Sequence, residues 1–309
     1  MGIPSIGTPI FWVGFIAFVL IMVTLDLGVF HRKAHEVGIR EALAWTSVWV
    51  GLALAFNLGI YFFFGPDRAL EFTTGYLIEE ALSVDNLFVF LVLLSYFAVP
   101  KALQHRVLFW GILGALVMRA LFIVAGAALI QRFHWVLYVF GAFLVFTGFK
   151  LLAQRESEVH PDRNAALKIF RRVLRAVPDY RGTRFVVRED GRWYVTPLLM
   201  VLLAVEATDI VFATDSIPAI FAITTDPFIV FTSNIFAVLG LRSLYFLLAG
   251  MMGKFRYLKV GLGLVLSFIG AKMLIAGVYK IPVGASLGVV AVLLAGSIVV
   301  SLLHPESKP

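Results

Sequence analysis

The sequence contains no cysteine and few charged residues. Without cysteine the chain forms no disulfide and offers no thiolate ligand to a metal ion. Only 15% of its 309 residues are charged and 61% are hydrophobic, whereas an average soluble domain has about 25% charged residues. The mean hydropathy is +0.94. We therefore expect most of the chain to lie in a lipid bilayer.

Nine apolar stretches approach or exceed the roughly 20 residues that a transmembrane helix needs. They cover residues 11–30, 42–64, 70–98, 107–130, 134–153, 197–223, 228–252, 257–279 and 283–303. No basic residue precedes the first stretch and no small-residue cleavage site follows it, so we expect an anchor that is retained. The predicted fold is an all-α polytopic membrane protein of about nine transmembrane helices.

The net charge of +7 has its origin in the segments between the spans. With the amino terminus outside, nineteen Lys and Arg residues fall in cytoplasmic segments, and Arg68, Arg132 and Lys280 fall outside. This asymmetry follows the positive-inside rule. It predicts a multi-pass protein of the bacterial inner membrane with a cytoplasmic carboxyl terminus. Membrane lipids are then the expected partners and nucleic acid is not; the oligomeric state is unknown from the sequence.

An acidic pattern occurs twice in the chain. Its copies are Glu79-x5-Asp85-Asn86 and Asp209-x5-Asp215-Ser216, with both acids offset by 130 residues. The next span of each set carries one arginine, Arg119 or Arg242. The span after that aligns at an offset of 122, which pairs Gly141 with Gly263, Gly148 with Gly270 and Lys150 with Lys272.

Each copy contains three spans, so the second copy must enter the membrane from the opposite side. Such inverted repeats place a transport site near the membrane midplane, where the two halves meet. We divide the chain accordingly into two amino-terminal spans, a first repeat, a cytoplasmic loop, an inverted second repeat, and a last span with a tail. These parts are 1–66, 67–153, 154–195, 196–280 and 281–309.

The loop at 154–195 is the one long polar segment. Residues 164–177 place apolar residues opposite basic ones at helical spacing, which suits a helix on an anionic lipid surface or one packed on protein. Residues 184–195 alternate around Asp190-Gly191, which predicts a β-hairpin.

Six acids fall within two predicted spans: Glu79, Glu80, Asp85, Glu206, Asp209 and Asp215. Each costs roughly 2.5–3.5 kcal/mol near the bilayer centre on insertion scales. Arg119 and Arg242 are the expected charge partners, but two arginines cannot balance six acids. The surplus negative charge predicts a cationic ligand.

The available ligand atoms favour a hard divalent cation. Carboxylates, the Asn86 amide and the hydroxyls of Ser83 and Ser216 are oxygen ligands, which suit manganese, magnesium or calcium. The ion is expected as transported cargo, with no resident cofactor. Closely spaced acids also share protons that a divalent ion displaces, so a proton is a candidate counter-ion.

The spacing of the acids predicts interrupted helices. Residues six apart on a straight helix lie about 120° from each other, so Glu79 and Asp85 face one site only if the helix opens between them. Pro218 follows Asp215 closely and is disfavoured inside a helix. We therefore expect both acidic spans to be discontinuous.

Four segments resemble the TerC family of integral membrane proteins. They are Leu25-Asp-Leu-Gly-Val-Phe-His-Arg-Lys-Ala-His, Glu79-Glu-Ala-Leu-Ser-Val-Asp-Asn-Leu-Phe-Val-Phe, His105-Arg-Val-Leu-Phe-Trp-Gly-Ile-Leu-Gly-Ala and Glu206-Ala-Thr-Asp-Ile-Val-Phe-Ala-Thr-Asp-Ser-Ile-Pro-Ala-Ile-Phe-Ala-Ile-Thr. The resemblance implies a LysE-like transporter of the bacterial inner membrane, linked to tellurium resistance and to manganese export.

The resemblance also implies which acids act in transport. The family's acidic positions correspond to Glu79, Asp85, Glu206, Asp209 and Asp215, with Asn86 and Ser216 beside them. Glu80 ranks below these five.

Two other functions remain open at this point. The LysE-like group includes amino-acid exporters, so the substrate could be a small cationic solute. Alternatively, the protein is a membrane scaffold in metal or tellurite stress that transports nothing. An enzyme is not expected, because the sequence shows no nucleophile–base pair, phosphate loop or cofactor fingerprint.

Overall fold

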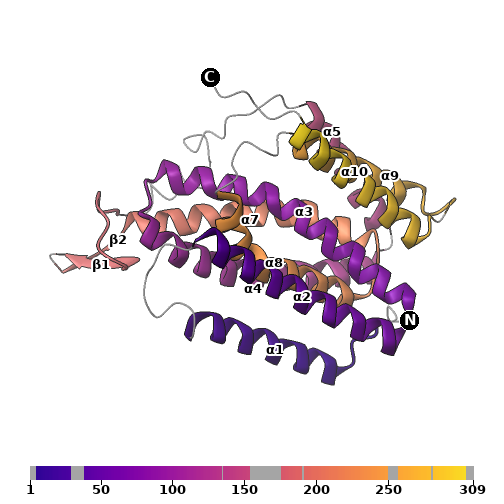
Figure 1. The fold of residues 1–309 in the computed structure, drawn as a ribbon, viewed down its shortest axis with the longest axis horizontal. Coiled ribbons are helices and arrows are strands. Elements are labelled where there is room, and N and C mark those ends of the chain that lie inside the picture. Colours follow the sequence, from indigo (N-terminus) through magenta and orange to yellow (C-terminus); the bar gives the residue numbers. More distant parts are fainter. Residues whose placement is uncertain are drawn as a thin grey trace.

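The computed structural model describes residues 5–28, 38–133, 135–153, 175–189, 191–249, 257–279 and 281–303. Within these ranges the chain forms nine helices and one two-stranded sheet (Figure 1). The helices are α1 Pro9–Gly28, α2 Ile39–Phe64, α3 Pro66–Tyr96, α4 Lys101–Arg132, α5 Val136–Ala153, α7 Pro197–Phe221, α8 Pro227–Ala249, α9 Leu258–Ile275 and α10 Val283–Leu303. Each predicted span corresponds to one helix, which confirms the all-α polytopic fold. The predicted surface helix at 164–177 lies largely outside the described residues.

Proline and small or polar residues determine where several helices begin. Gly65 adopts φ +91° between α2 and α3, and Pro66 then opens α3. Asp226 caps α8, since its Oδ1 accepts a 2.9 Å hydrogen bond from the Phe228 amide, with Pro227 between them. Proline suits the first helical position because the amide there has no helical partner. These local signals explain why the predicted starts of α3 and α8 lie close to the observed ones.

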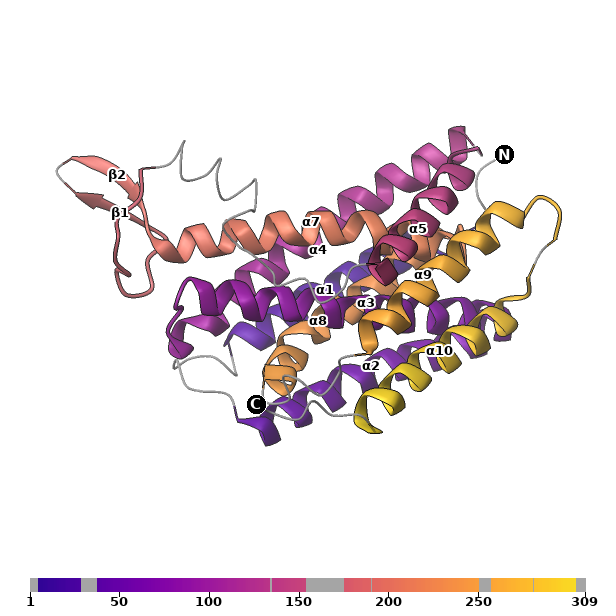
Figure 2. The ribbon, with the colours of Figure 1, turned by 90° about the horizontal axis from the view of Figure 1, so that it is seen from above.

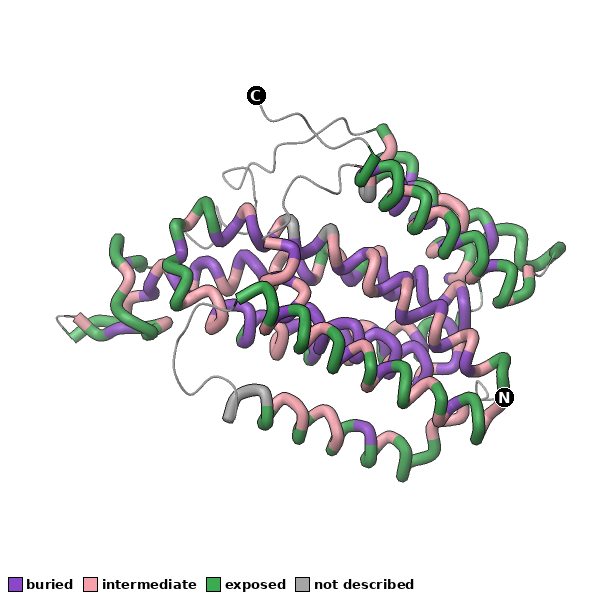
Figure 3. Tube along the Cα trace, viewed as in Figure 1, coloured by how far each residue is buried: buried purple, intermediate pink, exposed green. Residues whose placement is uncertain are grey.

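Helix α8 lies at the centre of the bundle. Most of its residues are buried, as the largely purple tube in Figure 3 shows, and it packs against α2, α3 and α4. A helix with apolar residues on all of its sides belongs in such a position. Helices α1 and α10 instead expose many large apolar side chains, as expected of helices that face lipid.

The helix contacts reproduce the inverted repeat. Under the repeat, α3, α4 and α5 correspond to α7, α8 and α9. The α3–α8 and α4–α7 contacts are therefore equivalent, and both are extensive. The α5–α9 contact relates two equivalent helices to each other and is the most extensive in the molecule. Figure 2 shows α5 and α9 side by side.

Glycines bring α5 and α9 into close contact. A Cβ atom on Gly148 would lie 2.7 Å from the carbonyl oxygen of Gly263, and one on Gly270 would lie 2.6 Å from that of Gly141. The repeat pairs Gly141 with Gly263 and Gly148 with Gly270. Replacing each glycine of the first contact by its repeat equivalent therefore gives the second contact. This is the self-complementary pattern of a two-fold axis, and small residues allow the close approach that membrane helices use.

The predicted hairpin is present and projects beyond one end of the helices (Figure 2). Its strands are β1 Val186–Glu189 and β2 Arg192–Val195, which pair antiparallel, with Glu189 opposite Arg192. Gly191 adopts φ +75°, as a two-residue hairpin turn requires. Nearby, the Tyr180 hydroxyl donates to the Phe97 carbonyl at 2.7 Å, and burial raises the pKa of the Tyr180 phenol, which keeps this donor protonated.

The expectation of discontinuous acidic helices is wrong. Helix α3 runs unbroken from Pro66 to Tyr96, and α7 runs from Pro197 to Phe221 with Pro218 inside it. Pro218 lies within the last turn of α7 and has no amide to bond to the carbonyl of Thr214, yet the helix continues through it to Phe221. The acids therefore keep the separate directions that a straight helix gives them.

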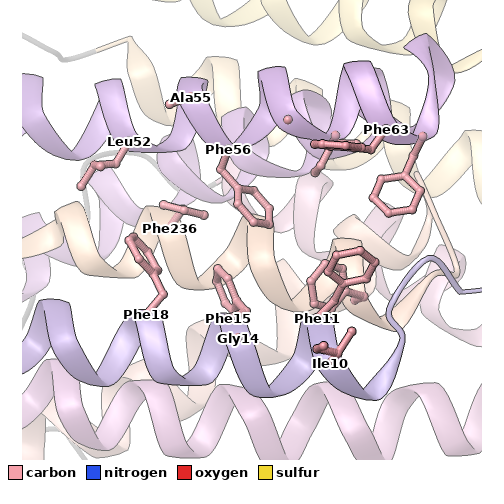
Figure 4. Close-up of a pocket in the computed structure, with 14 residues that line it drawn as sticks. Ile10, Phe11, Gly14, Phe15, Phe18, Leu52, Ala55, Phe56, Phe63 and Phe236 are labelled. Carbon is pink, nitrogen blue, oxygen red and sulfur yellow. The ribbon is translucent and has the colours of Figure 1, made fainter.

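An apolar pocket of 540 Å³ lies between α1, α2 and α8. Figure 4 shows Phe11, Phe15, Phe18 and Phe56 pointing into it from α1 and α2. All fourteen residues that line it are apolar or glycine. This pocket therefore lies apart from the acidic side chains.

Candidate functional site

A buried ionic network joins the two repeats. Arg119 of α4 is completely buried and pairs with acids from both acidic helices. Its Nη2 donates to Oδ1 of Asp209 at 2.9 Å, its Nε donates to Oδ2 of the same carboxylate at 3.3 Å, and its Nη1 donates to Glu79. The two acids are repeat equivalents, so Arg119 lies where the halves of the molecule meet.

Asn234 of α8 completes this network. Its Nδ2 donates to Oε2 of Glu79 at 2.9 Å, and its Oδ1 accepts from Nη1 of Arg119 at 3.3 Å. The Ser83 hydroxyl also donates to Glu79, at 3.4 Å. The sequence prediction missed Asn234, although an asparagine in the middle of an apolar span was an available signal. Four helices, α3, α4, α7 and α8, thus meet at one buried polar centre.

The network contains more carboxyl groups than cations. One guanidinium faces the carboxylates of Glu79 and Asp209, and two further acids lie close enough to interact with them electrostatically, Glu80 with Glu79 and Glu206 with Asp209. The Glu206 side chain occupies the space that a side chain on Gly114 of α4 would need. In the described part of the chain, the buried Oε2 of Glu80 has no hydrogen-bond partner. Such a centre favours an added positive charge.

Asp215 lies in a cavity that is separate from the Arg119 network. A cavity of 220 Å³ between α3, α5, α7 and α9 is lined by Asp215 together with Asn86, Thr147 and Lys150. The Thr147 hydroxyl donates to Oδ1 of Asp215 at 3.2 Å. Asp209 faces α4 and Asp215 faces α5, as the 120° between residues six apart on a straight helix requires. Glu79 and Asp209 are therefore ion-paired with Arg119, whereas Asp215 lines a cavity.

The other predicted residues take the following places. Asp85 lies on α3, but its side chain is outside the described part of the structure. Ser216 is buried and its hydroxyl has no partner among the described groups. Arg242 of α8 lines a small pocket together with Trp49 and Phe109. Among the described side chains, no three acids or histidines gather closely enough to hold a metal ion by themselves.

A further polar cluster lies around Glu71, near the amino-terminal end of α3. Glu71 accepts hydrogen bonds of 2.8 Å from Arg68 and from Thr224 in the α7–α8 connection. Lys272 of α9 is buried and interacts electrostatically with Glu71.

The family model for the "Integral membrane protein TerC family" matches residues 64–308. An "Uncharacterized membrane protein STKORF319" of Myxococcus xanthus is 58% identical over 99% of this chain and 96% of its own length. A protein of Escherichia coli strain K12 named "Putative membrane-bound redox modulator Alx" is 50% identical over 93% of this chain and 92% of its own.

An "Uncharacterized membrane protein" of Rickettsia bellii is 40% identical over 95% of this chain and 97% of its own length. No solved structure matches. The family match covers both acidic helices and the buried network between them. The chain therefore belongs to the TerC family of integral membrane proteins.

Proposed function

We propose that this protein exports a hard divalent cation, manganese(II) first among them, across the bacterial inner membrane. The observation that carries the proposal is the surplus of carboxyl groups where the inverted repeats meet, with the Arg119 guanidinium as the cation that pairs with both Glu79 and Asp209. Keeping uncompensated acids in the bilayer is costly and marks ion pathways. Transport would use alternating access of the two repeats around this centre.

The accessible cavity supports an entry point for the ion. Asp215, Asn86 and Thr147 present a carboxylate, an amide and a hydroxyl to one space, and Asp85 directly precedes Asn86 in the sequence. Oxygen ligands of this kind suit manganese, magnesium and calcium. The proposed ion ligands are therefore Asp215 at the cavity, Glu79, Glu206 and Asp209 deeper in the network, and Asp85, which is proposed from the sequence pattern alone. Protons are the proposed counter-ion.

The name of the Escherichia coli relative concerns redox modulation. The present chain has no cysteine, so a redox role for it would not use thiol–disulfide exchange within the chain.

Export of a small cationic solute is the second candidate, because the polar cavity also contains apolar walls.

Transport by the purified protein in liposomes distinguishes these candidates. We expect manganese to accumulate, excess magnesium or calcium to compete with it, and lysine and arginine to have no effect. Inhibition by the amino acids, together with their own accumulation, would replace the metal by a cationic solute. Absence of transport for both classes would contradict the transporter proposal.

A further inference from the structure

Lys150 shares the cavity of Asp215. It lies one turn after Thr147 on α5, and Thr147 holds the Asp215 carboxylate by a 3.2 Å hydrogen bond. Residues three apart on a helix share a face, so both side chains are directed at the same part of α7. Lys150 interacts electrostatically with Asp215. It is also exposed, which places it where the cavity reaches the surface.

The repeat supplies a natural comparison for this lysine. Lys272 is the equivalent of Lys150, but it is buried and interacts with Glu71 at the other end of α3. Glu71 already accepts hydrogen bonds from Arg68 and Thr224. The two equivalent lysines therefore have different acids and different surroundings, and Lys150 alone of the two lines the cavity of Asp215.

We propose that Lys150 is the resident counter-charge of Asp215 and sets the cavity's selectivity for divalent over monovalent cations. This inference rests on the proposed function, since it assigns a role at the same cavity. A single positive charge beside Asp215 disfavours the entry of any cation. A divalent ion gains about twice the attraction of a monovalent ion from the same carboxylates, so it displaces the lysine where sodium or potassium does not.

Transport kinetics of the full-length protein in liposomes test this inference. Lys150→Met removes the charge and keeps a long unbranched side chain. We expect it to lower the KM for manganese about tenfold, equivalent to about 1.4 kcal/mol, and to leave kcat within a factor of about two, because the deeper acids are unchanged. Potassium at high concentration should inhibit this variant and not the wild type. Lys150→Arg should behave as the wild type.

Lys272→Met is the matched control, since it makes the same change at the equivalent position away from the cavity. Its KM for manganese should equal that of the wild type, and potassium should not inhibit its transport. An unchanged KM and no potassium inhibition in Lys150→Met, with active wild-type protein, would overturn the role of Lys150 and leave the proposed function intact. Failure of the wild type to transport manganese would overturn the proposed function itself.

Discussion

At the scale of single residues, Arg119 is the centre of the polar core. Its guanidinium is completely buried and holds Glu79 and Asp209, while Asn234 bonds to both Arg119 and Glu79. Guanidinium geometry matches a carboxylate through two parallel bonds, which an ammonium cannot reproduce. Arg119 therefore fixes the distance between the two repeat-related acids.

Arg119→Gln should destabilise the protein by about 3–5 kcal/mol, because it leaves two buried carboxylates without their cation. Unfolding by denaturant in detergent micelles measures this loss. Arg119→Gln combined with Asp209→Asn should lose less than the sum of the two single variants, since one of the two acids that pair with the arginine is then neutral. Additive losses would contradict a coupled pair.

The sequence predicted most of these residues but not how they combine. Arg119 was expected as a charge partner, and it is one. Arg242, its repeat equivalent, lines a small pocket with Trp49 and Phe109, and Asn234 was missed. Repeat symmetry in the sequence relates positions on helices, whereas the contacts of a long side chain depend on which neighbouring helix it meets. Only the packing of α3, α4, α7 and α8 determines that.

At the scale of helices, the sequence predicted all nine helices that the described residues form, because lipid demands long apolar helices and proline or glycine lies at several boundaries. The expected breaks in α3 and α7 are absent. That expectation assumed that acids six residues apart must face one site. In the structure Asp209 and Asp215 face different helices instead, and no break is needed.

The close packing of α5 on α9 gives a second prediction. Gly148→Ala should destabilise the protein by about 1–3 kcal/mol, because its Cβ would meet the Gly263 carbonyl oxygen at 2.7 Å. Gly288→Ala on α10 is the control, since nothing lies within 4 Å of its added Cβ. That control should be neutral or gain up to about 1 kcal/mol from helix propensity. Thermal unfolding in detergent compares the two, and equal effects would argue against the glycine contact.

At the scale of the whole molecule, the inverted repeat implies that its two halves have opposite orientations in the membrane. The structure shows the equivalent helix pairs and the exchanged glycine contacts. The orientation rests on the distribution of Lys and Arg, which predicts an outer amino terminus and a cytoplasmic hairpin.

Single cysteines test this orientation cleanly, because the chain has none of its own. Asp67→Cys and Thr183→Cys change exposed positions near the start of α3 and before the hairpin. A membrane-impermeant thiol reagent added to intact cells with a permeabilised outer membrane should label Asp67→Cys only. Thr183→Cys should react once the inner membrane is opened. Labelling in the reverse order would invert the predicted topology.

The central claim is that the membrane acids carry a hard divalent cation, and manganese uptake into inside-out vesicles tests it most directly. Wild-type protein should accumulate manganese with release of protons from the lumen, and Asp215→Asn should abolish both. Glu189→Gln, which removes one carboxylate from the hairpin outside the bundle, should transport as the wild type does. Equal manganese accumulation by the wild type and Asp215→Asn would contradict the account.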